Sequence, residues 1–433
     1  MSRSAKASGL LRPRQPDGVP DQRDYVPREE AMRLLGVKRP TLYTYVSRGW
    51  IRSLPLNEGR KHVFSREDIE RMHTRSMARA GAAARAEGAM RYGEPVITTR
   101  ITEITPEGPR YRNRLALDLA REGSSFESVA VLLWTGAWPD EQLRWLADQP
   151  DFHPDDLVKA VGSGKAFDEV LKFLACTVLA LGVRSGSAAE LQRGDTLDSA
   201  RKILQVMTGV LGILSPRRRY TPVRPGESIA MSVARALGIP PTEETCYAIN
   251  AMMVLCADYE LTPANFTARV VASSGSDLHA CVAAGLCAHA GSQTGQICDK
   301  LEELLLDNTS RQSLGRRLET VRKFGVKVYG FNHPLYPKGD PRAYWMIELA
   351  KKLKPKSRAG QNAIWFLDRV QEDCHMYPGL PAGLMALAIA LELPRRSAPA
   401  IWGIARTAGQ IAHVMEQRNA GFVLRPRARF VAS

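Results

Sequence analysis

The sequence predicts a mainly α-helical protein, with a small N-terminal domain in front of a much larger helical domain. Three observations lead to this prediction. From about residue 126 onward, apolar residues recur at helical spacing in one run after another. Between residues 25 and 73, short helical patterns alternate with a turn and a hairpin signal. Between these regions, the Ala-rich stretch 77–90, MARAGAAARAEGAM, is typical of a linker.

Length and composition are those of a soluble globular protein with two or three domains. The chain has 433 residues, of which 44% are apolar and 24% charged. It has no run of about 18 apolar residues, and its basic N-terminus lacks the apolar stretch of a secretory signal. We therefore expect a cytoplasmic protein without a membrane partner, and a flexible basic arm over residues 1–24. The seven cysteines form no CxxC pair, which predicts buried free thiols and no metal site.

The positive charge is concentrated near the N-terminus. Of the formal net charge of +15, residues 1–100 contribute +9, from 20 basic and 11 acidic residues. Such asymmetry favours a polyanionic partner for this region, although a solvated basic surface is the alternative.

Residues 25–74 have the pattern of a helix-turn-helix with a wing. Gly36 is placed to end a first helix, and Pro40 is placed to open a second. Two β-like stretches flank residues 57–60, which predicts a hairpin. Ser65 is placed to cap a third helix through its hydroxyl.

The stretch YVPREEAMRLLGVKRPTLYTYVSRGWI, followed by GRKHVFSREDIERM, resembles the MerR/excisionase-like helix-turn-helix domain. The resemblance implies DNA as a partner, with cations on the second helix and the wing contacting phosphates. The alternative is a docking module that binds no DNA. The DNA-binding residues implied by the resemblance are Lys38, Arg39, Thr41, Tyr43, Thr44, Arg60 and Lys61.

The larger region begins with a β-like stretch at 96–104 and then becomes helical. Its apolar runs predict a multi-helix domain. The predicted helical runs are 126–134, 157–183, 229–237, 246–257, 278–289, 301–306, 343–353, 363–370, 382–393 and 401–416.

Two segments interrupt this regular pattern. Residues 329–342, YGFNHPLYPKGDPR, are dense in Gly, Pro and aromatic residues, which indicates a shaped loop that contains a His and an Arg. Residues 406–413, RTAGQIAH, place an Arg and a Gly inside an apolar helix. A lone His or Arg in such a place is usually structural, but the two segments together indicate a functional site.

The larger region resembles citrate synthase. GFxHPxYPxGDPRA, RTAGxIAHxxEQ with RPRxRFV, SFESVAVLLWTGAWP and the segment DYELTPANFTARVVASSGSDLHACVAAGLCAHAG match that family's motifs in family order, over about residues 95–431. The resemblance implies a citrate synthase fold, with a helical large domain and a helical small domain. The implied division is a linker at 75–94, a large domain at 95–295 and 392–433, and a small domain at 296–391.

The resemblance implies an acyltransferase of the tricarboxylic acid cycle that condenses an acyl-CoA with oxaloacetate. It implies a homodimer, acyl-CoA as co-substrate and no bound cofactor. The chemistry needs a carboxylate base, a donor for the enol, a donor that polarises the ketone, and cations for the two carboxylates of oxaloacetate. By motif position, His333 would polarise the ketone. Arg342, Arg406 and Arg425 would hold the carboxylates, the last of them across the dimer interface.

Three polar residues of the family pattern are replaced. The substrate-binding His of an Asp-His-Glu sequence is Tyr259 here, and the enol-stabilising His of an HGG loop is Thr294. The catalytic Asp falls on Pro381, which cannot take a proton. Loss of a positioned acid or base costs about 100- to 10,000-fold in rate, so condensation is expected to be weak or altered. Asp373 and His375 are candidate substitutes, with solvated loop residues as the alternative; Tyr259 and Thr294 still offer hydroxyl donors.

Three hypotheses follow from the sequence. The first is an enzyme of the citrate synthase class with normal, weak or altered activity. The second is a non-catalytic regulator, in which binding of an oxaloacetate-like dicarboxylate or CoA is reported by the helix-turn-helix on DNA. The third is a partner subunit of an intact citrate synthase, in a heteromer that Arg425 would help to complete.

Overall fold

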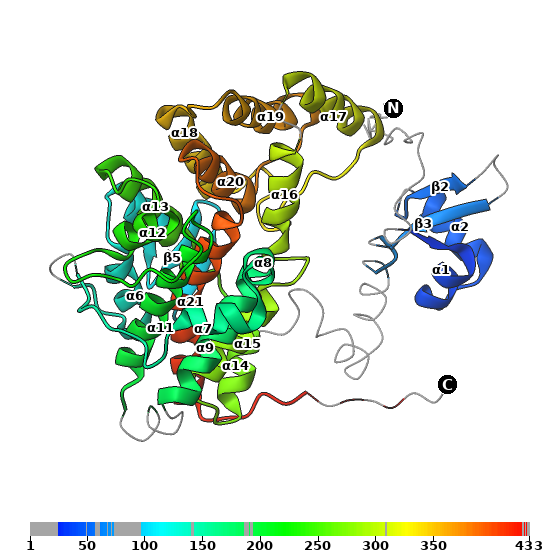
Figure 1. Ribbon diagram of the computed structural model, residues 1–433. Helices are drawn as coiled ribbons and strands as arrows, with labels where there is room; N and C mark the ends of the chain where they lie inside the picture. The colour runs from blue at the N-terminus through cyan, green and yellow to red at the C-terminus, as the bar shows by residue number, and fades with distance from the viewer. Residues whose placement is uncertain are drawn as a thin grey trace, which may run out of the picture. The chain divides into compact units, whose positions relative to one another are not determined.

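The computed structural model of the protein describes residues 25–48, 50–56, 61–66, 68–70, 72, 97–139, 143–185, 190, 194–307, 310–426, 428 and 430. The chain divides into two compact units. One holds Met1–Thr98 with the short stretch Lys323–Gly325, and the other holds Thr99–Arg322 and Val326–Ser433. The ribbon of both units is drawn in Figure 1.

The N-terminal unit is a helix-turn-helix with a short three-stranded sheet. The sheet has the order β1-β3-β2, and both pairs are antiparallel. The β2–β3 hairpin, with Leu56 opposite Lys61, forms the predicted wing. The elements of this unit are β1 (Tyr25–Pro27), α1 (Arg28–Leu35), α2 (Arg39–Ser47), β2 (Ser53–Leu56) and β3 (Lys61–Ser65).

Local chemistry sets the element boundaries of this unit. Gly36 ends α1 with a left-handed φ of 64°, as the sequence predicted. Pro40 lies in the first turn of α2, where its missing N–H removes no helical hydrogen bond. The Ser65 hydroxyl accepts the Asp68 N–H at 3.4 Å, so its predicted cap is also confirmed. A small core closes the unit, made of Val26, Ala31, Leu35, Leu42, Ile51, Phe64 and Ile69.

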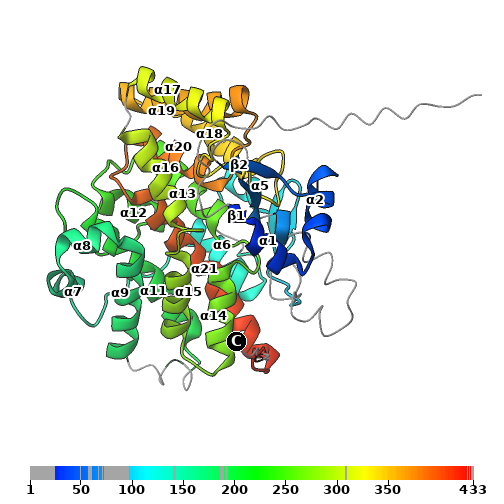
Figure 2. The same cartoon turned by 90° about the vertical axis from the view of Figure 1, so that its right-hand side faces the viewer.

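The larger unit is helical almost throughout, as the sequence predicted. Figures 1 and 2 agree that α17, α18, α19 and α20 gather at one end of it, and α9, α14 and α15 at the other. Its helices are α5 (Ala116–Arg121), α6 (Phe126–Thr135), α7 (Pro154–Val161), α8 (Ser163–Asp168), α9 (Val170–Ser185), α11 (Thr196–Val210), the 3-10 turn η1 (Leu211–Ile213), α12 (Ile229–Leu237), α13 (Glu243–Cys256), α14 (Pro263–Ser273), α15 (Leu278–His289), α16 (Gln296–Leu306), α17 (Arg311–Phe324), α18 (Pro341–Leu353), α19 (Arg358–Cys374), α20 (Leu380–Ala390) and α21 (Ser397–Ala420).

A small antiparallel sheet precedes these helices. It consists of β4 (Thr102–Thr105), β5 (Gly108–Tyr111) and β6 (Arg114–Leu115), in sequential order. The sequence placed β structure at 96–104, so the prediction is right in kind but begins too early. The turn after β5 holds Arg112 and Asn113 at positive φ, which closes the tight connection to β6.

Helix α21 is the buried axis of the larger unit. Most of its residues from Ser397 to Val414 are inaccessible to solvent, and it packs against α6, α13, α14 and α15. The indole N–H of Trp134 on α6 donates to Ala408 O at 3.0 Å, which fixes α6 against it. Gly409 lets α21 approach the end of α13 so closely that its own N–H donates to Ala257 O at 2.9 Å.

All seven cysteines are free. Cys256, Cys281 and Cys298 are buried as predicted, whereas Cys176 and Cys287 are exposed, so the prediction of a buried thiol is wrong for these two. No group of three or more His, Cys, Asp or Glu residues that could hold a metal occurs in the described part of the chain. Within the same residues, no helix is long and apolar enough to cross a membrane.

We expect Gly409→Ala to destabilise the larger unit. A Cβ at this position would lie 2.6 Å from Ala257 O and still closer to the carboxylate of Asp258, and backbone cannot yield easily. Overpacking of this kind costs about 1–3 kcal/mol, so thermal denaturation should show a clearly lower Tm. Gly315→Ala on α17 is the matched control, because a Cβ there meets nothing within 4 Å and helix propensity should stabilise the protein by up to about 1 kcal/mol. Equal Tm values for the two variants would contradict the close approach.

Candidate active site

The site is built around the C-terminal end of α13. The last carbonyls of a helix have no partner within the helix and attract donors and positive charge. Here three side chains from distant segments supply the donors: Tyr111 Oη to Val254 O at 3.1 Å, Arg342 Nη1 to Leu255 O at 3.1 Å, and Arg406 Nε to Cys256 O at 3.0 Å.

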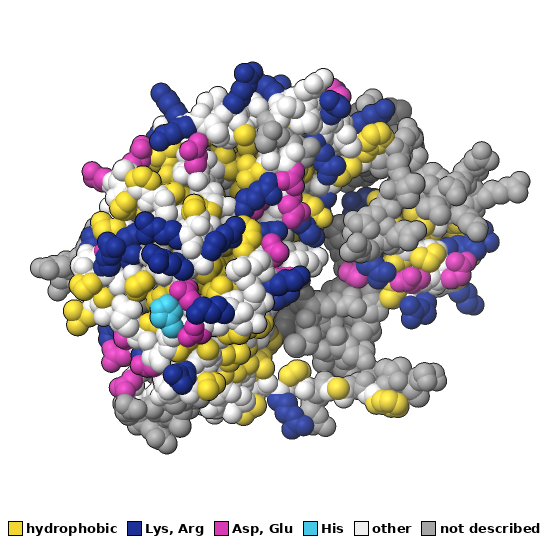
Figure 3. Space-filling model, viewed as in Figure 1, with side chains coloured by type: hydrophobic (Ala, Val, Ile, Leu, Met, Phe, Trp, Pro, Cys, Tyr) yellow, Lys and Arg dark blue, Asp and Glu magenta, His cyan; other side chains and the backbone are white. Residues whose placement is uncertain are grey.

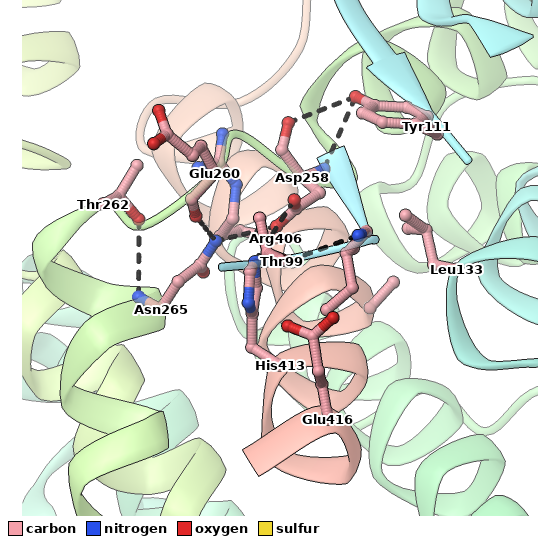
Figure 4. A network of polar contacts seen from close by, with 12 residues as sticks. Thr99, Tyr111, Leu133, Asp258, Glu260, Thr262, Asn265, Arg406, His413 and Glu416 are labelled. Carbon is pink, nitrogen blue, oxygen red and sulfur yellow. Dashed lines mark hydrogen bonds and ion pairs between the residues drawn. The ribbon is translucent and has the colours of Figure 1, made fainter. Parts of the chain in front are cut away.

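Asp258 lies two residues after the end of α13 and is completely buried (Figure 4). Asn265 Nδ2 donates to its Oδ1 at 2.7 Å, and His413 Nε2 lies 3.4 Å from its Oδ2. Burial opposes ionisation of this carboxyl most strongly, but the neighbouring His413 and Arg406 outweigh it and hold the pKa of Asp258 below its ordinary value. A buried carboxylate therefore lies beside Arg406 in the folded protein.

The polar network continues along α21 (Figure 4). Arg269 Nη1 lies 3.4 Å from His413 Nδ1 and donates to Glu416 at 2.6 Å. His413 thus has Nδ1 toward Arg269 and Nε2 toward Asp258. Glu416 also accepts the backbone N–H of Arg100 at 2.8 Å. The network thus runs from the end of α13 to the first residues of the larger unit.

His333 lies in the loop that the sequence singled out, residues 329–342. The loop is held against the start of α20, since Gly379 N donates to Gly330 O at 2.8 Å and Phe331 forms an isolated bridge with Pro378. The N–H of Leu335 donates to His333 Nδ1 at 3.2 Å, so the neutral ring carries its proton on Nε2. Burial lowers the pKa of His333, which favours this neutral form. His333 is thus arranged as a hydrogen-bond donor through Nε2.

Arg342 and Arg406 come together on one aromatic ring. Their guanidinium carbons lie 4.5 Å and 5.9 Å from the ring centroid of Tyr259, and the His333 ring is 5.8 Å away. The Tyr336 ring lies 6.4 Å from Tyr259, and burial raises the pKa of Tyr336 to about 12. Of the residues that the sequence proposed for the site, His333, Arg342 and Arg406 therefore all lie close to the ring of Tyr259.

Thr294 is engaged in local structure. Its hydroxyl faces the carbonyls that end α15 and donates to the nearest of them, His289 O, at 2.6 Å. Gly295 N also donates to His289 O, at 2.8 Å. A threonine in this position caps helix carbonyls, and its only proton is directed at the backbone rather than at a ligand.

Pro381 and its candidate substitutes lie in different surroundings. Pro381 occupies the first turn of α20, close to Gly330 of the His333 loop. Asp373 pairs with Arg369 at 3.1 Å on α19. His375 ends α19 with a left-handed φ of 53° and an exposed side chain. Pro381 thus lies beside the loop, whereas Asp373 serves as an ion-pair partner and His375 as a helix end.

Arg425 does not join the other arginines within one chain. It is exposed in the segment after α21. Two contacts hold the start of that segment, from Gln417 Nε2 to Phe422 O at 2.9 Å and from Leu424 N to Ser273 Oγ at 3.0 Å. In Figure 1 the segment leaves the helical body of the larger unit.

The proposed DNA-contacting residues are distributed unevenly on the N-terminal unit. Lys38 and Arg39 are exposed at the start of α2, and Thr41 is half-buried. Tyr43 packs edge-on against Phe64 at 6.2 Å, and the Thr44 hydroxyl donates to Pro40 O at 2.9 Å. Lys61 begins β3, and Arg60 lies outside the described residues. In Figure 3, Lys and Arg side chains lie among acidic ones on the visible face of this unit.

Sequence reasoning missed several residues that shape these sites. Tyr111, Asn265, Arg269 and Tyr336 were not singled out, because each is polar or aromatic within an ordinary element and shows its role only through distant partners. The N-terminal unit also has an exposed pair, since Arg48 lies 5.3 Å over the ring of Trp50, which is 45% exposed. The sequence Ser-Arg-Gly-Trp at the end of α2 was the available signal.

Comparison with protein families agrees with this geometry. The model of the citrate synthase C-terminal domain matches residues 90–427, and that of a helix-turn-helix domain matches residues 28–75. The chain belongs to the citrate synthase family. The predicted resemblance to that family is therefore confirmed, together with the N-terminal helix-turn-helix domain.

Citrate synthase family members of several organisms resemble most of the chain. Citrate synthase 2 of Bacillus subtilis is 25% identical over 72% of this chain and 88% of its own length. Citrate synthase of Haloferax volcanii is 28% identical over 72% of this chain and 86% of its own length. 2-Methylcitrate synthase of Mycobacterium tuberculosis is 25% identical over 78% of this chain and 88% of its own length. The citrate synthase of Thermoplasma acidophilum, solved as a ternary complex with carboxymethyl coenzyme A and oxaloacetate, has a TM-score of 0.70 at 20% identity, over 79% of this chain and 95% of that one. This last likeness shows the citrate synthase fold.

The buried His289 beside the site makes stability depend on pH. Burial, helped by the charge of Arg406, lowers the pKa of His289 to about 3, so the folded protein keeps this ring neutral. The unfolded chain takes up a proton near pH 6.5, so stability contributed by the neutral ring is present above that pH and is lost as the pH falls toward 3.

We therefore expect His289→Phe to reduce the acid sensitivity of the fold. The ring packs edge-on against Trp402 at 4.7 Å, and its Nε2 has no hydrogen-bond partner in the described structure, so a phenyl ring keeps the packing. Urea unfolding gives the free energy of unfolding at about pH 7.5 and about pH 5.5. Between these two pH values, this free energy should fall by about 1.4 kcal/mol more for the native chain than for the variant. Identical losses in both proteins would show that His289 protonates freely in the fold.

Proposed function

We propose that the larger domain of this citrate synthase family member binds an oxaloacetate-like 2-oxo acid, and that it condenses this ligand with acyl-CoA slowly or not at all. The observation that carries the proposal is the contrast between two positions. His333 presents Nε2–H, and its ring and the guanidinium of Arg406 each lie within about 6 Å of the Tyr259 ring, which suits a ligand with both a ketone and a carboxylate. Thr294, at the position of the enol donor, gives its proton to His289 O. The site thus retains groups for holding a keto acid and lacks groups for making the nucleophile.

The binding half of the proposal has a physical basis in Arg406. A guanidinium binds a carboxylate with two parallel hydrogen bonds, and such bonds are stronger where water is excluded. Arg406 is 2% exposed, burial lowers its pKa more than the nearby Asp258 raises it, and it forms no ion pair within the described residues. A ligand carboxylate reaching the remaining N–H groups of Arg406 would therefore not have to displace a protein carboxylate.

We further propose that the N-terminal domain binds DNA, so that the chain reports ligand occupancy at a DNA site. The family match over residues 28–75 and the exposed Lys38 and Arg39 at the start of α2 support this. A cytoplasmic regulator would need no rapid turnover, which agrees with the replaced acyl-activating residues.

A second candidate function is the partner role, in which this chain pairs with itself or with an intact citrate synthase. The segment after α21 favours it, because it is exposed and combines Arg425 with apolar side chains, Phe422 at 51% and Val423 at 63% exposure. A second subunit would cover these side chains and receive the guanidinium.

We expect thiol release from acetyl-CoA or propionyl-CoA with oxaloacetate to be at least about 100-fold slower than for an intact family member, because base and enol donor are both replaced. Calorimetry should still detect a 2-oxo acid, and Arg406→Ala should abolish that heat. His333→Ala is the control for turnover. Rapid thiol release that disappears in His333→Ala would refute the non-catalytic proposal.

Duplex DNA should bind the full-length chain in a salt-dependent way. Electrophoretic mobility titrations at low and moderate salt should show Arg39→Ala weakening binding and reducing the salt slope by about one, as expected for a lost phosphate contact. Arg121→Ala is the charge-matched control, since Arg121 is exposed on α5 of the larger unit beside Asp118. If no duplex binds at any salt concentration, the DNA proposal is wrong.

A further inference from the structure

Tyr259 occupies the middle of the ligand-holding residues. It follows the buried Asp258, and its own side chain is only 9% exposed. Two guanidinium carbons and two aromatic rings lie within about 6.5 Å of its centroid, with Arg342 the nearest at 4.5 Å. Because it is buried between two guanidinium groups, the Tyr259 side chain helps to define the shape of the site.

Asp340, Leu255 and the ring of Tyr259 all contact the guanidinium of Arg342. Nε and Nη2 of Arg342 donate to the two carboxylate oxygens of Asp340 at 3.0 Å and 2.7 Å, and Nη1 donates to Leu255 O. Tyr259 covers one face of the guanidinium, and the whole side chain is 1% exposed. Asp340 neutralises the charge of Arg342 and occupies two of its N–H donors, so a ligand carboxylate would have to compete with Asp340 for this guanidinium.

Arg406 differs from Arg342 in this respect. It lies farther from the Tyr259 ring, at 5.9 Å, and donates one N–H to Cys256 O. A guanidinium carries four further N–H donors, and in the described part of the chain none of those on Arg406 forms an ion pair. Of the two arginines, Arg406 is the one able to receive a carboxylate.

We propose that Asp340 and the ring of Tyr259 together withhold Arg342 from the ligand, and that Tyr259 thereby makes the site select 2-oxo acids with one carboxylate and an apolar side chain over oxaloacetate. This rests on the proposed 2-oxo acid binding. Arg406 takes the carboxylate, and His333 Nε2 donates to the adjacent ketone. The rings of Tyr259 and Tyr336 contact the apolar remainder of the ligand.

The chemistry of burial favours this selection. A second carboxylate placed against two phenol rings loses water without gaining a cation, whereas an alkyl group there gains from burial. Discrimination between ligands that differ by one buried charged group commonly reaches factors of ten to thousands, so we expect about tenfold or more in favour of the monocarboxylate.

The test compares 2-oxobutyrate with freshly dissolved oxaloacetate by isothermal calorimetry on the full-length chain. The native protein should bind 2-oxobutyrate at least about tenfold more tightly than oxaloacetate. Tyr259→His, which shortens the side chain, should lower this preference for 2-oxobutyrate by about tenfold or reverse it. Tyr259→Phe is the matched control, because it keeps the ring over Arg342 and loses only the hydroxyl, so the preference should persist.

Each other outcome overturns a specific statement. Tighter binding of oxaloacetate by the native chain, or an unchanged ratio in Tyr259→His, overturns the role of Tyr259 while leaving 2-oxo acid binding intact. If neither ligand binds the native chain or Tyr259→His, the proposed function fails and this inference with it. Circular dichroism of each variant separates loss of binding from loss of fold.

Discussion

The last carbonyls of α13 need hydrogen-bond donors from outside the helix, and the rest of this structure depends on that constraint. They emerge inside the larger unit, where water cannot reach them, and a buried carbonyl without a partner is costly. Tyr111 from the small sheet, Arg342 from the start of α18 and Arg406 from α21 each supply a donor, and Gly409 adds its own N–H one residue beyond the helix. Segments some 300 residues apart in the chain are thereby fixed to one another. The site exists because all of them must meet at this helix end.

This arrangement gives the two arginines a structural function besides any function in binding. Burying a guanidinium is unfavourable unless it is paired, and here Asp340 pairs with Arg342 directly while Asp258 balances Arg406 nearby. The positive guanidinium groups of Arg342 and Arg406 also interact favourably with the negative end of the α13 helix dipole. An arginine retained at such a position is therefore insufficient evidence of substrate binding. What distinguishes Arg406 is that its fork is not closed by a carboxylate.

Much of the fold could be predicted from the sequence, and the reasons for success and failure are specific. Helices α12 and α15 were predicted to the residue, since apolar runs and clear caps coincide there. Helix α17 was missed although Leu314, Leu318 and Val321 have helical spacing, because charged residues dominate the segment. For the site, motif order located His333 and Arg406. Nothing local could show that the Thr294 hydroxyl caps a helix end, since that depends on how the chain turns after α15.

The two replaced positions of the acyl-activating half have a common property. Thr294 satisfies carbonyls at the end of α15, and Pro381 stands in the first turn of α20, where its fixed φ favours the helix and its missing N–H costs nothing. Catalytic residues often hold strained or unsatisfied arrangements that reduce stability, and replacing them commonly stabilises a fold. Thr294 caps a helix end and Pro381 starts a helix, so both residues contribute to local stability. On the proposed function, this local stability stands in place of reactivity, while His333 and Arg406 supply the donors that a keto acid requires.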